Sequence, residues 1–274
     1  MLALVVSTAA ADVELASDVL WSLGVVAIEE RVTADGVELW TSLGDDSDAV
    51  IEAASRRLAR WSWHLIEVDE TVADTWRAHA QPVWIEPDLV VCPAWVPFET
   101  HSDLERGATV LRIEPGATFG LGDHPTTMLS MRAIRRSLRA GSTVLDVGCG
   151  SGVLAVGACV LGASQAVAID IAPASVPITR ANAATNGVAD LVEVSTTPLG
   201  EIDGQFDIVV ANILAPTLIE LADDLVRAVA PTGVLIISGV LADRHEHVEA
   251  ALRPLHRIHR ETLDGWAAIT LAAD

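Results

Sequence analysis

The chain has 274 residues, of which 51% are hydrophobic, and this composition predicts a globular protein with a large core and room for two domains. Its formal net charge of −21 argues against an extended nucleic-acid interface, because phosphate binding needs clusters of Lys and Arg, and favours a basic protein partner. A general solubility or salt-adaptation trait explains the acidity equally well.

The first 70 residues have the pattern of a small α+β domain. We expect helices from Asp12 to Leu23 and from about Ser47 to Arg60, and strands at 2–7, 25–32, 37–43 and 63–68. The order β-α-β-β-α-β is that of a ferredoxin-like unit. Such a unit is either a partner-binding domain or a purely structural appendage.

Residues 71–114 are expected to connect this domain to the rest of the chain. Residues 71–80 favour a short linking helix, and residues 82–114 favour short strands interrupted by prolines. A loop rich in glycine and proline follows, and it leads at Thr126 or Thr127 into a helix that ends near Leu138. We expect one of these two threonines to cap the helix or to reach a ligand.

Strands and helices alternate from about residue 140 onward. Strands are expected at 143–147, 165–170, 191–195, 206–211, 233–238, 255–261 and 266–272, and helices at 152–162, 173–186, 215–230 and 242–253. Alternation of this kind predicts an α/β fold with a doubly wound, mostly parallel, seven-stranded sheet. The short turn at Asp264-Gly265 predicts that the last two strands form a terminal hairpin.

The most informative motif is Val144-Leu-Asp-Val-Gly-Cys-Gly-Ser-Gly152, followed by Ala166-Val-Ala-Ile-Asp170. Gly148 and Gly150 end a buried strand at a turn where the backbone approaches a ligand closely. Asp170, at the end of the next strand, can accept hydrogen bonds from both hydroxyls of a ribose. By itself the glycine spacing also describes a simple tight turn between a strand and a helix.

The spacing G-x-G-x-G, preceded by acidic Asp146, differs from the dinucleotide pattern G-x-G-x-x-G. A carboxylate is a poor neighbour for a diphosphate, but it suits S-adenosylmethionine, which carries a sulfonium and an ammonium group. Asn212 follows the fourth strand of the sheet, where its side-chain oxygen could accept a hydrogen bond from an amine near the transferable methyl group. The alternative for Asn212 is a turn residue that caps the helix beginning near Ala215.

Several other patterns indicate no special chemistry. Residues Val147–Ile169 carry no charge, but their glycines favour a buried core over a membrane span. No secretion signal is recognised at the N-terminus. The three cysteines are widely spaced, and His245, His247, His256 and His259 lack accompanying cysteines or a carboxylate pattern. We therefore expect no metal, no membrane association and a cytoplasmic location.

The loop Phe119-Gly-Leu-Gly-Asp-His-Pro-Thr-Thr127 matches seven of nine positions in the loop F-G-T-G-T-H-P-T-T of the ribosomal protein L11 methyltransferase family. The chain resembles that family over roughly residues 74–272. Further matches are the glycine turn, Ile169-Asp-Ile171, Ala211-Asn-Ile-Leu-Ala215, Ser238-Gly-Val-Leu241 and Trp266, and a hairpin that closes the sheet is also typical of such methyltransferases. Leu121 and Asp123 depart from the family pattern, which has threonine at both positions.

The resemblance implies a class I methyltransferase domain at 115–274, a linker at 71–114 and a substrate-recognition domain at 1–70. It implies transfer of methyl groups from S-adenosylmethionine to lysine side chains, and to the N-terminal amine, of ribosomal protein L11, by a chain expected to be a monomer. The catalytic candidates are Asn212, Asp123 and His124. The expected cofactor-binding residues are Phe119, Gly120, Thr127, Asp146, Gly148, Gly150, Asp170 and Asn212.

Three other functions stay open from the sequence. The same catalytic half could methylate lysines of another protein, such as an electron-transfer flavoprotein subunit. The chain could instead be a cofactor-binding assembly protein without turnover. A nicotinamide-dependent dehydrogenase is disfavoured by the glycine spacing.

Overall fold

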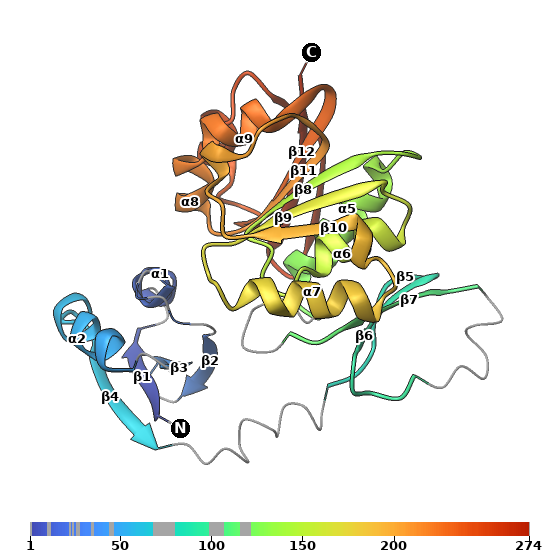
Figure 1. The fold of residues 1–274 in the computed structure, drawn as a ribbon. Coiled ribbons are helices and arrows are strands. Elements are labelled where there is room, and N and C mark those ends of the chain that lie inside the picture. The colour runs from blue at the N-terminus through green and yellow to red at the C-terminus, as the bar shows by residue number, and fades with distance from the viewer. Residues whose placement is uncertain are drawn as a thin grey trace. The chain divides into compact units, whose positions relative to one another are not determined.

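The fold comes from a computed structural model, which describes residues 2–9, 12–21, 23, 25, 28–33, 36–43, 47–67, 80–98, 107–115 and 122–273. The chain forms two compact units, Met1–Ala80 with Ala117–Phe119, and Gln81–Gly116 with Gly120–Asp274 (Figure 1). The linking helix expected at 71–80 lies almost entirely outside the described residues.

The first unit contains one sheet and two helices, in the order expected from the sequence. Its elements are β1 (Leu2–Thr8), α1 (Val13–Trp21), β2 (Glu29–Thr33), β3 (Gly36–Ser42), α2 (Ser47–Arg57) and β4 (Ser62–Glu67). The strand order is β2-β3-β1-β4, and all neighbours are antiparallel, as in a ferredoxin-like unit. Leu4, Leu20, Leu39 and Leu58 lie in a core that belongs to this unit. The second strand begins at Glu29, four residues later than predicted.

The second unit is built on the predicted seven-stranded sheet. Its strands are β8 (Thr143–Val147), β9 (Gln165–Ile169), β10 (Val192–Ser195), β11 (Phe206–Asn212), β12 (Val229–Leu241), β13 (His256–Leu263) and β14 (Trp266–Ala272). The order is β10-β9-β8-β11-β12-β14-β13, and β14 runs antiparallel to both of its neighbours. The terminal hairpin is therefore confirmed.

Helices cover both faces of this sheet (Figure 1). One face packs against α5 (Pro125–Ser137), α6 (Val153–Val160) and α7 (Ser175–Thr185), and the other against α8 (Ala215–Glu220), α9 (Ala222–Ala228) and α10 (Glu246–Ala251). Alternate residues of β8 divide between the two cores: Val144 faces the first set of helices and Leu145 the second. Short 3-10 turns occur at Ala189–Leu191 and Leu199–Glu201.

The prediction of one continuous helix at 215–230 is wrong. The structure has two helices there, α8 and α9, which are separated at Leu221. The strand expected to begin at residue 233 starts at Val229, which pairs with Phe206. Gly233 allows this pairing, since a Cβ atom there would lie 2.7 Å from the carbonyl oxygen of Phe206.

A second, three-stranded sheet belongs to the same unit. It consists of β5 (Val83–Glu86), β6 (Leu89–Pro93) and β7 (Thr109–Ile113). Strands β5 and β6 are antiparallel, and strands β6 and β7 are parallel. Ile85, Leu111 and Ile113 join the core formed by α5 and α6. From Gln81 onward, the segment expected to be a linker thus packs as part of the second unit.

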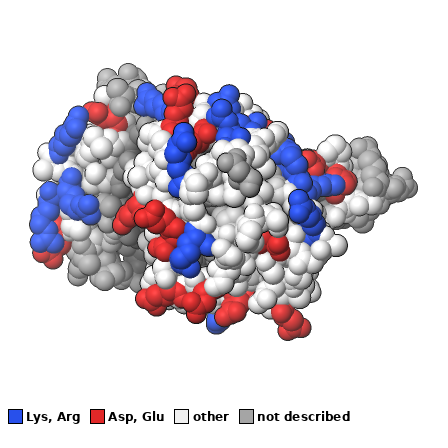
Figure 2. Space-filling view, turned by 90° about the horizontal axis from the view of Figure 1, so that it is seen from above, with Lys and Arg blue, Asp and Glu red and all other residues white. Residues whose placement is uncertain are grey.

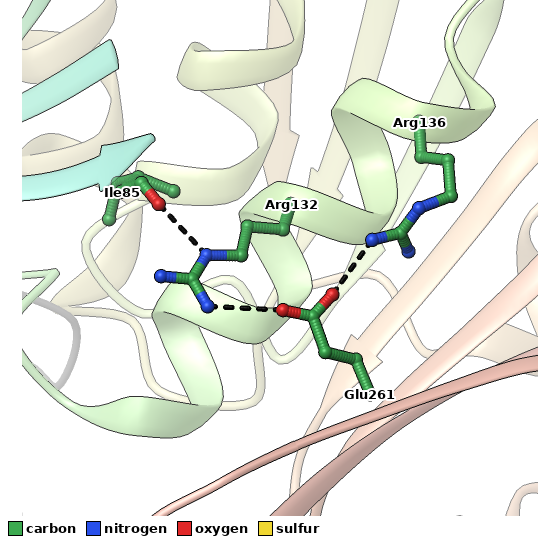
Figure 3. Close-up of polar contacts among 4 residues, drawn as sticks. All are labelled: Ile85, Arg132, Arg136 and Glu261. Atoms are coloured by element: carbon green, nitrogen blue, oxygen red, sulfur yellow. Dashed lines mark hydrogen bonds and ion pairs between the residues drawn. The ribbon is translucent and has the colours of Figure 1, made fainter. Parts of the chain in front are cut away.

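Hydrogen bonds and ion pairs connect α5 to both sheets. Figure 3 shows the side chain of Arg132 donating from Nε to the carbonyl oxygen of Ile85 (2.8 Å) and from Nη1 to Oε1 of Glu261 on β13 (3.0 Å). Arg136 donates from Nη2 to Oε2 of the same glutamate (2.7 Å). Because α5 follows directly on the loop of the family motif, these contacts fix the helix that carries that motif's last residues.

The uncharged stretch Val147–Ile169 is divided among the end of β8, the glycine turn, α6 and β9. Within the described parts of the chain, no helix has the length and apolar character needed to cross a membrane.

Candidate active site

The carboxyl ends of three adjacent strands bring three predicted residues to the same edge of the sheet. Val147, the last residue of β8, pairs with Ile169 of β9 on one side and with Ala211 of β11 on the other. Gly148, Asp170 and Asn212 each follow directly on one of these paired residues. In open α/β sheets ligands bind beyond such strand ends.

The glycine turn is tight because its backbone adopts conformations that other residues avoid. Gly148 and Gly150 have φ angles of 75° and 54°. The amide of Gly148 donates to the carbonyl oxygen of Ile169 (2.8 Å), and a Cβ atom on Gly148 would collide with Cγ2 of Ile213. Gly148 is nevertheless exposed to solvent, so its backbone is open to close approach by a ligand.

Asp170 is held in place by two backbone amides. Its Oδ2 accepts a hydrogen bond from the amide of Gly150 and its Oδ1 one from the amide of Ala172, both 2.8 Å long. A carboxylate oxygen has two lone pairs, so each oxygen can accept a further bond. Ile171, beside it, is 96% exposed and provides an apolar surface next to the carboxylate. Sequence reasoning did not identify Ile171 as a site residue.

Asp146 lies inside β8 and is only 1% exposed. Its Oδ2 accepts a hydrogen bond from the amide of Ala155 (3.0 Å), while its Oδ1 has no partner among the described residues. Burial raises the pKa of Asp146 to about 7, although the bond from Ala155 acts in the opposite direction, and the nearby negative charge of Asp170 adds to the rise. When the carboxyl is ionised, the unpaired oxygen is an acceptor beside the glycine turn.

Asn212 is the last residue of β11 and pairs in register with Ser238 of β12. Helix α8 has Leu214 at its N-cap position, without a side-chain cap. The alternative in which Asn212 caps this helix is therefore wrong, and its half-buried side chain serves no capping role.

The residue that caps α5 is His124, so the expected cap at Thr126 or Thr127 is wrong. Nδ1 of His124 accepts from the amide of Thr126 (3.3 Å) and lies 2.7 Å from its Oγ1. Burial lowers the pKa of His124, and the neighbouring charge of Asp123 opposes this only in part. Thr127 is 1% exposed, and its hydroxyl has no partner among the residues described.

Two residues attach the His124–Thr127 turn to the sheet. Oγ of Ser238 lies within hydrogen-bond distance of the carbonyl oxygens of Thr126 (3.3 Å) and Ala267 (3.1 Å). The ring of Trp266 contacts the His124 imidazole edge to face, with centroids 5.3 Å apart. Because Ser238 is the strand partner of Asn212, the turn lies at the same edge as Asn212. The sequence matched Ser238 and Trp266 to family segments but did not reveal this anchoring.

Other predicted positions contribute less to the described geometry. Phe119 and Gly120, like Leu121, lie outside the described residues. Asp123 is exposed and adjoins His124. In the described part of the chain, no three His, Cys, Asp or Glu side chains are grouped so as to hold a metal ion.

The unpaired oxygens of Asp146 and Thr127, the open glycine turn and the fixed carboxylate of Asp170 fit a ligand with a ribose and positively charged groups. This edge, together with the sheet order and the reversed strand β14, defines a class I methyltransferase that depends on S-adenosylmethionine. Residues 44–274 match the model of the family Ribosomal protein L11 methyltransferase (PrmA). The chain belongs to this family.

Individual relatives agree with this assignment. A ribosomal protein L11 methyltransferase of Citrifermentans bemidjiense is 43% identical over 208 residues, which cover 74% of this chain and 67% of the relative. One of Geobacter metallireducens is 47% identical over 180 residues, covering 66% of this chain and 58% of the relative. The chain thus spans about two thirds or less of the length of these relatives.

A solved structure has the same fold. The ribosomal protein L11 methylase of Lactobacillus delbrueckii subsp. bulgaricus superimposes with a TM-score of 0.64 at 30% sequence identity. The match covers 71% of this chain and 98% of that one.

Proposed function

We propose that this chain transfers methyl groups from S-adenosylmethionine to amino groups of ribosomal protein L11, on lysine side chains and on the N-terminal amine. The observation that carries the proposal is the single edge at which the glycine turn, Asp170, Asn212 and the His124–Thr127 turn meet. Membership of the L11 methyltransferase family supports the choice of substrate.

The cofactor-binding role is assigned to residues around the glycine turn. Asp170 would accept bonds from the ribose hydroxyls, and Ile171 would pack on the flat face of the adenine. Asp146 and Thr127 offer unpaired polar atoms, and Gly148 and Gly150 allow close approach of the backbone. Phe119 and Gly120 complete the set by family resemblance.

When bound, S-adenosylmethionine supplies an electrophilic methyl group on a sulfonium. A lysine amine has a usual pKa of about 10.4, so the site must favour the neutral amine. Asn212 would accept a hydrogen bond from the amine through its side-chain oxygen and direct the nitrogen lone pair. The nitrogen–carbon bond then forms as the carbon–sulfur bond breaks, and the amine proton leaves to solvent or to a base.

The contacts of His124 favour Asp123 over His124 as the proton acceptor. Nδ1 of His124 accepts from the amide of Thr126, so the proton of the neutral ring resides on Nε2. The lowered pKa keeps the ring neutral, and a neutral ring protonated at Nε2 is a donor there. Asp123, exposed next to it, would attract an incoming ammonium and receive or relay its proton.

The finer properties form part of the same proposal. The chain would act as a monomer in the cytoplasm, with the unit at 1–70 recognising L11, and without direct contact to nucleic acid. The net charge of −21 supports the last point. Figure 2 shows one face of the molecule, on which arginines lie among carboxylates instead of forming one continuous basic surface.

The second candidate is methylation of lysines in another protein, such as an electron-transfer flavoprotein subunit. The separate ferredoxin-like unit favours L11, because enzymes of that second kind are expected to consist of the catalytic half alone. A cofactor-binding protein without turnover is the third candidate.

Intact-mass spectrometry of purified, unmethylated L11 incubated with this protein and S-adenosylmethionine tests the proposal. We expect mass gains of about 14 Da per methyl group, which Asp170→Ala should abolish by removing the ribose acceptor. An Asn212→Ala protein should lose transfer but keep most of its cofactor binding. If L11 gains no mass while cofactor binding is intact, the substrate assignment is wrong.

A further inference from the structure

Two asparagines, Asn182 in helix α7 and Asn186 at its C-cap position, face the open edge of strand β7 and the residue that follows it. Asn186 accepts from the amide of Arg112 through Oδ1 (2.8 Å) and donates from Nδ2 to the carbonyl oxygen of the same residue (2.7 Å). One helical turn earlier, Asn182 accepts from the amide of Glu114 (2.9 Å) and donates to its carbonyl oxygen (2.8 Å). Figure 1 shows α7 running alongside β7.

These four bonds reproduce what a neighbouring strand would supply. Strand β7 is at the end of the order β5-β6-β7, so its outer amides and carbonyls have no strand partner. Glu114 directly follows the last residue of β7, and its backbone groups point to the same side as those of Arg112, as alternate residues of an extended chain do. A side-chain amide carries one acceptor and two donors, and it can therefore pair with both groups of one residue.

Each asparagine makes one further side-chain bond, and the two differ in where it goes: Nδ2 of Asn186 donates to the carbonyl oxygen of Asn182 within the helix end (2.8 Å), whereas that of Asn182 reaches the glycine turn. There Nδ2 of Asn182 donates to the carbonyl oxygen of Ser151 (2.8 Å). Asn182 is 1% exposed, and the amide of Glu114 and the two carbonyl oxygens leave only one orientation of its side-chain amide. The same helix face holds the turn through Thr179, whose Oγ1 donates to the carbonyl oxygen of Gly150 (3.3 Å).

We propose that Asn182 is a positioning residue that fixes the glycine turn relative to Glu114, where the segment leading to His124 begins. The inference rests on the proposed function, in which the glycine turn and the 114–127 segment bind the same cofactor. Asn182 joins these two parts of the site by a single buried side chain, across 31 residues to Ser151 and 68 residues to Glu114.

Removing the side-chain amide of Asn182 should lower cofactor affinity more than removing that of Asn186. Asn182→Ala removes the bonds that this side chain makes to the Ser151 carbonyl and to both backbone groups of Glu114, so the direct link between the glycine turn and Glu114 is lost. Asn186→Ala removes the same kind of bonds from β7, together with one bond to the Asn182 carbonyl oxygen, but it leaves the Asn182 side chain bonded to the glycine turn. Asn186→Ala is therefore the matched control.

The test is isothermal titration with S-adenosylhomocysteine of the full-length wild type, Asn182→Ala, Asn182→Asp and Asn186→Ala proteins. We expect the Kd to rise about tenfold in both Asn182 variants, a loss of about 1.4 kcal/mol, and to stay within about twofold in Asn186→Ala. The aspartate keeps the volume and the bond from the Glu114 amide, but it loses both donated bonds. In steady-state assays the KM for S-adenosylmethionine should rise and the KM for the amine substrate should not.

The outcomes separate the two proposals. A wild-type protein that binds no S-adenosylhomocysteine overturns the proposed function. Normal wild-type binding with equal effects of the Asn182 and Asn186 substitutions overturns the positioning role. If neither Asn182 variant folds, hydrogen exchange of the wild type decides: cofactor binding should slow exchange at the Glu114 amide, and unchanged exchange there refutes the coupling.

Discussion

Gly148 and Gly141 have similar backbone conformations in different surroundings, with φ angles of 75° and 83°. A Cβ atom at Gly148 would strike Ile213, next to Asn212, whereas at Gly141 nothing lies within 4 Å. Gly141→Ala should cost only the backbone strain, about 1 kcal/mol, and leave cofactor affinity unchanged. Gly148→Ala should cost more and raise the Kd for S-adenosylhomocysteine at least about tenfold. Denaturant unfolding and calorimetric titration of both variants measure the two effects, and equal behaviour would show that the turn's close packing has no role in binding.

Asp146 predicts a pH dependence of cofactor affinity. Burial raises the pKa of this carboxyl from 3.8 to about 7, so the free protein holds a proton that the unfolded chain has lost. The free energy of unfolding of the free protein should therefore fall as the pH rises from 3.8 through about 7. A cationic cofactor favours the carboxylate, so binding should release the proton and tighten from about pH 6 to about pH 8.

Titration calorimetry of S-adenosylmethionine in two buffers of different ionisation enthalpy would count the released protons. Asp146→Asn, which has no titratable group there, should bind with little dependence on pH over this range. If the wild type and the variant show the same pH profile, Asp146 is not the group that titrates.

At the scale of single residues, the sequence predicted the ends of neighbouring strands well. Gly148, Asp170 and Asn212 could be placed together because every parallel strand delivers its next residue to the same edge. His124 was missed as a cap because the preference for Ser, Thr, Asp and Asn drew attention to the threonines; Pro125 at the first helical position was the available signal. The role of Asn182 was not visible, since its partners are distant in sequence.

Among the elements, α5 is held by contacts that can be removed singly. Burial favours a higher pKa for Glu261, but hydrogen bonds and charges from Arg136 and Arg132 outweigh it and hold the pKa below its usual value of 4.5. Glu261→Gln should therefore destabilise the protein by about 1 kcal/mol near neutral pH. Because the pKa is depressed in the folded state, this difference should shrink as the pH falls below 4.5.

The matched control is Glu52→Gln, which removes an exposed i,i+4 pair with Arg56 and should cost no more than about 0.5 kcal/mol. Urea unfolding at several pH values measures the loss of stability in both variants. Equal small losses in the two variants would mean that the Arg132–Glu261–Arg136 contacts add nothing beyond an ordinary surface pair.

Element types were predicted more accurately than element ends. From Thr217 to the end of α9 the apolar period continues without a proline or glycine, so the sequence carried no sign of the break at Leu221. The early start of β12 was hidden by Pro231 and Gly233, which are typical of a turn. Only the pairing of Val229 with Phe206 places these residues in a strand.

For the whole molecule, alternation of strands and helices predicted the sheet and its hairpin but gave no reason to join residues 83–113 to the catalytic unit. Prolines lie in or next to the short strands β5, β6 and β7, and such a sequence pattern is typical of a connector. They are drawn into the unit because Ile85, Leu111 and Ile113 cover α5 and α6, a contact that depends on three-dimensional packing.

The net charge of −21 gives a prediction at this scale that separates the protein substrate from the cofactor. Opposite charges accelerate encounter between proteins, and salt screens them over about 10 Å at 0.1 M ionic strength. If L11 approaches as a basic protein, kcat/KM for L11 should fall several-fold between about 0.05 M and about 0.5 M NaCl. The Kd for S-adenosylhomocysteine, which depends on contacts within one edge of the sheet, should change much less. Stopped-time methylation assays and titrations at matched salt concentrations compare the two quantities. A kcat/KM that is insensitive to salt would assign the acidity to solubility or salt adaptation and leave substrate recognition to short-range contacts.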